Sequence, residues 1–298
     1  MKDLNDFTIG CSQLGMIMSG SEKSNLTEKQ SLELSRLLYK GTPLTELQDK
    51  KVDFLIAKRD GIVEPYLSAG AKKYLMVRYS RYRYGKRYKI RHVGEMKFTQ
   101  MLKGTLVESN AVKLLSEIDQ MEYFRVKTSI KSDYLYGYLD MLDAPTVDAA
   151  SRIFEIKNCF DIASFMLRVG QPLPKSIWYQ MQGYLSITGK DIGEVAFCLC
   201  DFPDYMINEQ REIIFTAMCP DRIETDAFIN YWNQAEKSMR FQDIPAKQRV
   251  VSYIVHRDDA VIKKINERVV TCRNWLQKWS ANYNEFIEKR YIPTDDNP

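Results

Sequence analysis

The chain has 298 residues, 45% of them hydrophobic, and a formal net charge of +4 at pH 7. This length allows one large domain or two smaller ones, and the lack of any run of about 18 apolar residues predicts that no segment spans a membrane. The first residues have no charged stretch followed by an apolar one, which predicts no secretory signal, and six cysteines without close spacing indicate buried free thiols in the cytoplasm.

Helices dominate the first part of the chain. Residues 1–20 predict a short extended piece that leads into a helix, with Ser12 as its N-cap. Residues 27–58 have the leucine spacing of a helix that is interrupted at a Gly-Thr-Pro sequence. Residues 104–120 repeat the helical spacing and place Glu108 one turn into that helix.

The remainder of the chain mixes strands and helices. Strands are predicted at residues 123–141 and 152–159, joined by a turn that contains a proline. The later elements are a helix at 174–188, a strand at 194–200, a strand or short helix at 209–218, and helices at 221–240 and 258–290. This mixed order predicts an α/β or α+β fold in a single domain over residues 1–292, followed by a flexible tail over residues 293–298.

The segment over residues 71–98 holds most of the positive charge. It contains ten Lys or Arg and one acid, so its net charge is +9 while the rest of the chain carries −5. Interleaved tyrosines favour a nucleic-acid surface, because cations neutralise phosphates and rings stack on bases. The candidate DNA-contacting residues in it are Arg78, Arg81, Tyr82, Arg83, Lys86 and Arg87. The alternative is a solvated basic hairpin around Gly85 whose tyrosines pack on the core.

The two predicted strands carry the residues with the clearest chemistry. Because successive strand side chains point to opposite faces, Glu155 and Lys157 share one face, while Phe154 and Ile156 point toward a core. Asp140 closes the preceding strand, so two carboxylates and an ammonium meet at one sheet edge. This arrangement suits a divalent metal beside a phosphodiester, and it indicates a nuclease.

Phosphodiester hydrolysis needs an activated water and a stabilised leaving oxygen, and two metal ions about 3.5–4 Å apart supply both. Mg²⁺ prefers oxygen ligands, which predicts Asp140, Glu155 and the backbone carbonyl of Ile156 as ligands. Glu108 would reach a metal directly or through water. Lys157 would orient or deprotonate the attacking water, or stabilise the charged transition state. The alternatives are a surface Glu–Lys pair, a turn aspartate whose role Asp143 or Asp148 would take, and a glutamate that favours the positive end of its helix.

These motifs, in this order, resemble the lambda-type (YqaJ-like) viral recombination exonucleases of the PD-(D/E)xK superfamily. The matching stretches are residues 9–15, 104–111, Gly137-x-x-Asp140, Glu155-Ile156-Lys157, Tyr179-Gln180-Met181-Gln182, 187–190 and 197–203. The resemblance covers residues 7–20 and 100–205. It implies a restriction-endonuclease-like core, in which a central mixed β-sheet is flanked by helices.

The resemblance also implies a set of roles and partners. It assigns the site to the acids Glu108, Asp140 and Glu155, the lysine Lys157, and the glutamine Gln182 with Gln180 as the nearby candidate. The alternative for both glutamines is a plain hydrogen-bonding role inside a helix packed on the sheet. The family digests one strand of linear duplex DNA from the 5′ end, uses Mg²⁺, for which Mn²⁺ can substitute, and leaves 3′ overhangs for a single-strand-annealing protein. Some members form a ring-shaped homotrimer. The implied setting is the cytoplasm of a bacterial host.

One departure from the family concerns the pocket for the 5′-phosphate. The family has an Arg shortly before the Ser-containing start and a Ser two residues before the motif Asp. This chain keeps Ser12, but Asn5 falls near the first of those positions and Tyr138 occupies the second. The cations of residues 71–98 are the candidates to replace the missing contacts.

Three other functions compete with the exonuclease reading. One is an endonuclease or repair nuclease of the same superfamily, which would also cut a closed duplex. Another is a CRISPR-associated relative with an iron–sulfur cluster, which needs four Cys ligands, commonly a close C-terminal set, and the cysteines from Cys198 to Cys272 are too scattered to favour it. The third is a non-catalytic DNA-binding or virion protein, against which the intact Asp140, Glu155 and Lys157 set argues.

Overall fold

The computed structural model describes residues 4–19, 26–59, 67–84, 99–126 and 128–289. By their contacts the described residues form two compact units. Unit 1 combines residues up to 89 with 132–135 and those from 259 onward, and unit 2 comprises 90–131 and 136–258. The single nuclease domain over residues 1–292 stays a prediction. No helix within the described ranges is long and apolar enough to cross a membrane.

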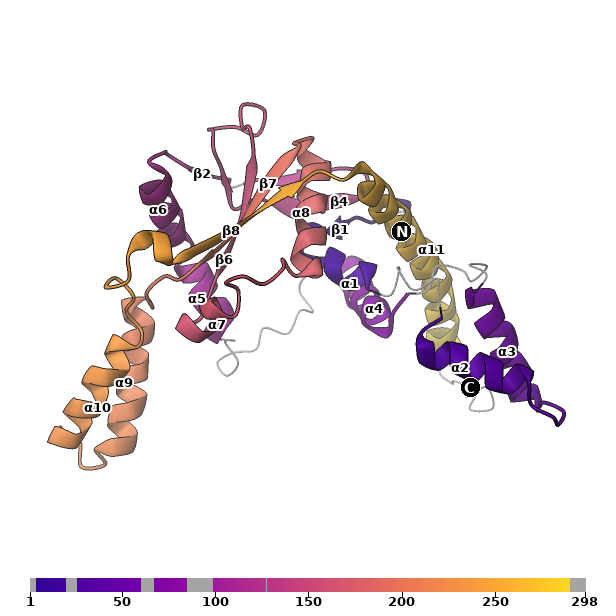
Figure 1. Ribbon diagram of the computed structural model, residues 1–298, viewed down its shortest axis with the longest axis horizontal. Helices are drawn as coiled ribbons and strands as arrows, with labels where there is room; N and C mark the ends of the chain where they lie inside the picture. Colours follow the sequence, from indigo (N-terminus) through magenta and orange to yellow (C-terminus); the bar gives the residue numbers. More distant parts are fainter. Residues whose placement is uncertain (1–3, 20–25, 60–66, 85–98, 127, 290–298) are drawn as a thin grey trace. The chain divides into compact units, whose positions relative to one another are not determined.

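Unit 2 is built on a mixed five-stranded sheet in the order β2-β5-β6-β7-β8 (Figure 1). The strands are β2 (Phe124–Arg125), β5 (Met141–Leu142), β6 (Ile153–Asn158), β7 (Ile192–Cys198) and β8 (Val250–His256). Only the central strands β6 and β7 pair in parallel, and the other neighbours in this sheet are antiparallel. A parallel pair needs a crossover connection, which here contains α8 (Lys175–Thr188).

Helices cover both faces of this sheet. On one face, α6 (Glu108–Asp119) buries its apolar side against Phe154 and Ile156 of β6. The alternate residue Glu155 points to the opposite face, where its side chain meets Gln180 of α8. The predicted division of β6 into a core face and a polar face is therefore confirmed, and the polar face lies under α8.

Helix α8 is tightly enclosed. It starts after Pro174 and stops at Gly189, whose left-handed φ of +72° favours glycine. All seven residues from Tyr179 to Leu185 are buried. The helix approaches β7 so closely that a Cβ built on Gly193 would lie 2.3 Å from the sulfur of Met181.

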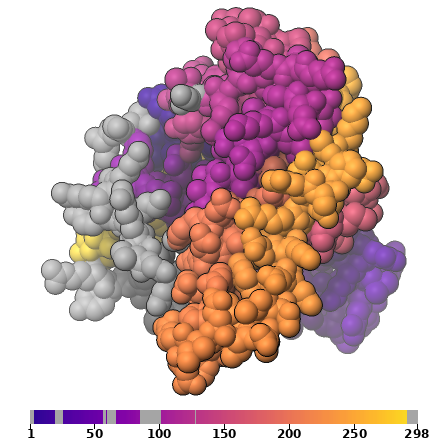
Figure 2. All heavy atoms as spheres, turned by 90° about the vertical axis from the view of Figure 1, so that its left-hand side faces the viewer, coloured from indigo at the N-terminus to yellow at the C-terminus, as the bar shows by residue number. Residues whose placement is uncertain are grey.

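The other elements of unit 2 frame the sheet. They are α5 (Thr99–Leu106), the hairpin of β3 (Ser129–Lys131) with β4 (Leu135–Tyr138), α7 (Ile162–Met166), α9 (Asp204–Met218), α10 (Asp226–Lys237) and the 3₁₀ turn η4 (Ala246–Gln248). Figure 2 shows α9 and α10 in orange, packed side by side. Strand β4 begins at Leu135, which belongs to unit 1.

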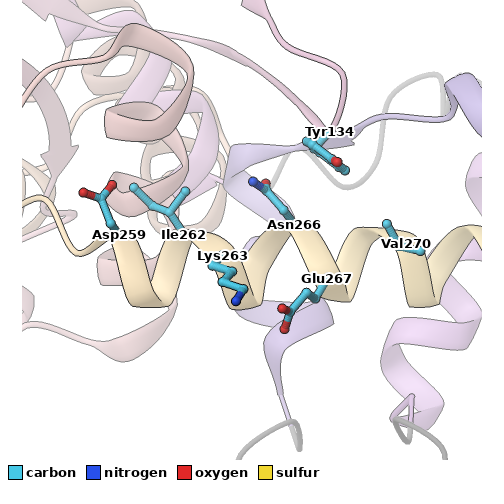
Figure 3. A pocket seen from close by; sticks show the side chains of 7 residues that line it. All are labelled: Tyr134, Asp259, Ile262, Lys263, Asn266, Glu267 and Val270. Carbon is cyan, nitrogen blue, oxygen red and sulfur yellow. The ribbon is translucent and has the colours of Figure 1, made fainter.

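Unit 1 is helical. Its elements are η1 (Leu4–Asp6), β1 (Ile9–Gly10), η2 (Cys11–Gln13), α1 (Leu14–Met18), α2 (Glu28–Leu38), α3 (Glu46–Arg59), α4 (Ala69–Tyr84) and α11 (Asp259–Lys289). Helix α11 contacts α1, α4 and η1, and its Arg273 donates a 2.8 Å hydrogen bond to the carbonyl of Phe7. A cavity of about 390 Å³ lies along α11, where Asn266 points toward Tyr134 (Figure 3).

Several predicted elements are confirmed. The helix over residues 27–58 is observed as α2 and α3 with the expected break, and the helices at 174–188 and 258–290 are observed as α8 and α11. The strand at 194–200 is β7, and residues 209–218 belong to the helix α9. All six cysteines are free and buried. The predicted tail over 293–298 and the second half of the basic segment, residues 85–98, lie outside the described residues.

Other predictions need correction. Ser12 is not an N-cap, because it lies inside η2, and α1 is preceded by Gln13 without a side-chain cap. The strand predicted over 123–141 is divided by turns into β2, β3, β4 and the start of β5. The helix predicted over 104–120 breaks at Val107, so Glu108 is the first residue of α6 rather than one turn into it. Strand β8 is an element that the sequence interpretation did not include.

Candidate active site

The centre of the site is the polar face of β6. The ammonium of Lys157 donates to Oε1 of Glu155 at 2.5 Å. Glu155 is buried, whereas 30% of the Lys157 side chain is exposed, so the lysine lies between the buried acid and solvent. The strand thus brings a carboxylate and a cation together with one end of the pair open to a substrate.

Helix α8 adds an amide to this pair. Nε2 of Gln180 donates to Oε1 of Glu155 at 2.7 Å and to the hydroxyl of Tyr184 at 3.1 Å. Its Oε1 accepts from Nζ of Lys157 at 3.2 Å. A neutral amide that both donates and accepts therefore fixes the acid and the lysine relative to each other.

Gln182 points elsewhere. Its Nε2 donates to the carbonyl of His256 at 2.8 Å, and its Oε1 accepts from the backbone N–H of Asp258 at 2.9 Å. These bonds tie α8 to the end of β8. Of the two glutamines proposed from the sequence, the structure brings Gln180 to the acids, and Gln182 has the plain hydrogen-bonding role weighed as its alternative.

Asp140 lies between β4 and β5 rather than at the end of a strand. The pairing of β5 with β6 stops at Phe154, and Oδ2 of Asp140 accepts from the backbone N–H of Ile156 at 2.8 Å. In a strand the N–H and C=O of one residue point to the same side, so the Ile156 carbonyl points to the side of β6 on which Asp140 lies. The acid and the predicted carbonyl ligand therefore share one side of the strand.

Glu108 comes to the site from α6. Its Oε1 pairs with Nη2 of Arg125 at 2.7 Å, and Arg125 is opposite Met141, the residue after Asp140, in the β2–β5 pairing. The charge of Glu108 is close enough to raise the pKa of Asp140. Glu108 thus brings a third acid, paired with Arg125, to the neighbourhood of Asp140.

Burial raises the pKa of two of these acids, Asp140 and Glu155. Burial, then the charge of Glu155 and that of Glu108, raise the pKa of Asp140 to about 8, against the opposing effects of the Ile156 N–H and Lys157. Burial also raises the pKa of Glu155, although Lys157, Gln180 and Tyr184 favour its ionised form. A site that brings buried and partly buried carboxylates near each other favours a cation that would neutralise them.

The donor set fits a hard divalent metal in its chemistry. Oε2 of Glu155 is buried and has no hydrogen-bond partner among the described residues, which leaves a carboxylate oxygen available as a ligand. The neighbouring Asp140 and the Ile156 carbonyl add oxygens of the type that Mg²⁺ prefers. In the part of the chain that the structure describes, no group of three or more His, Cys, Asp or Glu side chains lies close enough together to hold a metal. Glu108 is paired with Arg125 instead.

The predicted DNA-contacting residues lie in unit 1. Ser12 is exposed on η2, and Arg78, Arg81, Tyr82 and Arg83 lie on helix α4 rather than on a hairpin. Arg81 and Arg83 are exposed, while the guanidinium of Arg78 lies over the ring of Phe7 at 5.8 Å. Lys86 and Arg87 lie outside the described residues.

Two site residues were missed from the sequence. Tyr184 hydrogen-bonds to Gln180 one helical turn earlier, so the i, i+4 spacing on α8 was a usable signal. Arg125 meets Glu108 only through the pairing of β2 with β5, which no local pattern specifies. Tyr138, which replaces the serine expected from the sequence resemblance, belongs to unit 2 and is 60% exposed.

Comparison with known proteins establishes the fold class of the chain. No protein-family model matches the chain, and no curated protein matches it either. Among solved structures it is similar to a phage-related exonuclease from Haemophilus somnus 129PT, with a TM-score of 0.56 and 17% identity over 93% of this chain and 97% of that one. Another similar structure is an alkaline exonuclease (LHK-Exo) from Laribacter hongkongensis, with a TM-score of 0.48 and 14% identity over 92% and 98% of the two chains. The Haemophilus structure confirms the predicted fold class, a mixed sheet flanked by helices.

Proposed function

We propose that this chain is a metal-dependent deoxyribonuclease that degrades one strand of linear duplex DNA, from 5′ to 3′, in recombination of the phage type. The observation that carries the proposal is a hydrogen-bond network. It joins Glu155 and Lys157 on β6 to Gln180 on α8, next to Asp140. That network lies in a fold shared with a phage-related exonuclease. It also supports the PD-(D/E)xK assignment, because the Asp, Glu and Lys of that motif lie together.

Each residue of the network has a role in hydrolysis. Asp140, Glu155 and the Ile156 carbonyl would hold Mg²⁺, with Mn²⁺ as a substitute, and Glu108 would contribute directly or through water. When bound, such ions activate water and stabilise the leaving oxygen. Lys157, held by Glu155 and Gln180, orients the attacking water or stabilises the negative charge that develops on the phosphate. Burial of Glu155 strengthens these charge interactions.

The proposed substrate is a duplex end. The cations on α4, of which Arg81 and Arg83 are exposed, supply the positive charge that a DNA backbone needs. Ser12 is the residue kept from the family's 5′-phosphate pocket. A homotrimer, a single-strand-annealing partner and a bacterial cytoplasmic setting are proposed on the sequence resemblance.

Two substitutions test the catalytic assignment. Asp140→Ala and Lys157→Ala should abolish Mg²⁺-dependent hydrolysis of a labelled linear duplex while DNA binding in Ca²⁺ is retained. Lys113→Ala, which removes an exposed cation from α6, serves as the matched control and should keep both properties. Wild-type-like hydrolysis by both site variants would refute the assignment.

A further inference from the structure

Arg125 is a cation of the site that the nuclease motif does not include. Its Nη2 is 2.7 Å from Oε1 of Glu108, at the start of α6. Strand β2, which carries Arg125, pairs with the strand β5 that follows Asp140, and Arg125 is opposite Met141 in that pairing. The ion pair with Glu108 holds the guanidinium, and the strand pairing places its backbone beside the residue that follows Asp140.

Folding stability does not account for this ion pair. The Arg125 side chain is 47% exposed and that of Glu108 is 26% exposed, and a pair of this kind contributes only about 0–1 kcal/mol. Glu108 is also the first residue of its helix, where the helix dipole already favours a carboxylate. The pair instead holds a partly exposed guanidinium in one orientation.

The other cations nearby do not take this role. The ammonium of Lys157 is held by Glu155 and Gln180, and the proposed mechanism already assigns it to the attacking water and the phosphate that is cut. Arg152 pairs with Glu194 at 3.1 Å, and its guanidinium lies 4.9 Å from the centre of a core ring. Among the described residues, Arg125 has one partner, Glu108. Most of the five N–H donors of the Arg125 guanidinium are therefore available.

A guanidinium with free N–H groups near the acids Glu108 and Asp140 suits one ligand class in particular. Its planar fork matches two oxygens of a phosphate, and its charge does not depend on pH in the physiological range. A phosphodiester brought to Asp140 and Glu155 would have neighbouring backbone phosphates within reach of this edge of the sheet. Half-exposure leaves the guanidinium open to such a ligand.

We propose that Arg125 is a substrate-contacting residue that binds the non-bridging oxygens of a DNA backbone phosphate at the site, with Glu108 holding its guanidinium in place. This inference rests on the proposed nuclease function and extends it. Glu108 thereby has a second role besides its contribution to metal binding. Arg125 differs from the cations of α4 in that it belongs to unit 2, which also contains Asp140, Glu155 and Lys157.

The test pairs a substitution in the protein with one in the DNA. Linear duplexes each carry a single methylphosphonate, a neutral replacement for one phosphate, at successive positions near the end of the strand. Binding to each is measured in Ca²⁺, and hydrolysis in Mg²⁺, for the wild type, Arg125→Ala, Arg125→Lys and the control Lys113→Ala. Circular dichroism and thermal unfolding check that every variant is folded.

The expected result is coupling at one position. Arg125→Ala should weaken binding of the unmodified duplex about tenfold, and a methylphosphonate at the contacted position should weaken wild-type binding by a similar factor. The same methylphosphonate should have little further effect on Arg125→Ala, and Arg125→Lys should lie between the two. Lys113→Ala should match the wild type at every position.

Two other results would overturn the inference. Unchanged binding by Arg125→Ala would do so, and so would effects of protein and DNA substitutions that multiply independently at every position. The nuclease function is judged separately, by whether the wild type hydrolyses the unmodified duplex in Mg²⁺. Because coupling is measured from binding in Ca²⁺, it decides the role of Arg125 whether or not hydrolysis is seen.

Discussion

Asp140 is the residue whose environment conflicts most with its ionised form. Its pKa rises from an ordinary 3.8 to about 8, because the side chain is partly buried and lies near Glu155 and Glu108. Between these two values the metal-free folded chain binds more protons at this site than the unfolded chain does. The contribution of Asp140 to the free energy of unfolding therefore falls as the pH rises from about 4 to about 8.

Asp140→Asn should stabilise the metal-free protein while it removes activity. Asparagine has no charge to bury, and its side-chain oxygen still accepts from the Ile156 N–H. Because each unit of pKa shift corresponds to about 1.4 kcal/mol, we expect a gain of at least about 1 kcal/mol at pH 8 and less at pH 5. Urea unfolding in EDTA at both pH values, with the exposed Asp148→Asn as control, measures this difference. A variant less stable than the wild type at pH 8 would contradict the electrostatic account.

Gln180 and Gln182 should differ in the kind of property they affect. Gln180→Ala removes the amide that holds Glu155 and Lys157, so hydrolysis should fall about 10–100-fold. Gln182→Ala leaves the Asp258 N–H and the His256 carbonyl without their partner. It should cost about 1–3 kcal/mol of stability, with near wild-type activity per folded molecule. Kinetics and urea titrations on both variants measure the two properties. A stability loss in Gln180→Ala together with an activity loss in Gln182→Ala would contradict this assignment.

The sequence predicts this site unevenly. Alternation along a strand was enough to place Glu155 and Lys157 on one face and Phe154 on the other, because that rule is local. It could not separate Gln180 from Gln182, because both lie in a helix that is buried all around. The contact of Arg125 with Glu108 depends on strand register, which is set by tertiary packing.

At the scale of elements, the close approach of α8 to β7 positions the site. Gly193 allows it, since a Cβ there would lie 2.3 Å from Sδ and 2.9 Å from Cγ of the fully buried Met181. A Cβ at this position would force the Met181 side chain, which lies one residue from Gln180 on α8, to move. The lack of a side chain at Gly193 thus gives Met181 room to pack between α8 and β7.

Gly193→Ala should destabilise the protein by about 1–3 kcal/mol because the core has no room for the added methyl group. The double variant Met181→Ala/Gly193→Ala should lose less stability than the two single losses combined, since the smaller residue leaves space for the new methyl. Gly104→Ala is the control, because its Cβ would meet nothing within 4 Å, and it should be neutral or slightly stabilising. Thermal unfolding of Gly193→Ala, Met181→Ala, the double variant and Gly104→Ala measures these losses of stability. Losses that simply add in the double variant would argue against a steric cause.

Elements with strong local signals were predicted well, and others were not. Helices α8 and α11 have clear apolar periodicity and stop or start signals, so their bounds were close. The break before Glu108 occurs at Val107, which is neither Gly nor Pro, so nothing in the sequence marked it. Strand β8 has a local signal of its own, a run rich in Val, Ile and Tyr that favours a strand.

At the scale of the whole molecule, the charge is divided between regions. The net charge is only +4, yet residues 71–98 alone carry +9. Unit 1 is assembled from segments at the start, middle and end of the chain, an organisation that no local sequence pattern predicts. The helix α4 of this unit carries the exposed arginines, while the acids belong to unit 2.

Arg81→Ala should make DNA binding less sensitive to salt. Each phosphate contact that is lost reduces the slope of log affinity against log salt concentration by about one. The control is Arg36→Ala, which removes an exposed arginine from α2, outside the basic segment, and should leave the slope unchanged. Fluorescence anisotropy titrations at several salt concentrations give the slopes, and equal slopes for both variants would remove Arg81 from the DNA surface.

The central claim is that the chain hydrolyses DNA from an end with the β6 site. The most direct measurement compares a 5′-labelled linear duplex with a covalently closed circle of the same sequence, each incubated with Mg²⁺ and either the wild type or Lys157→Ala. The account predicts that the wild type releases labelled nucleotides from the linear duplex, leaves the circle intact, and loses this activity in Lys157→Ala. Cleavage of the closed circle at a similar rate, or no hydrolysis of the linear duplex by the wild type, would contradict it.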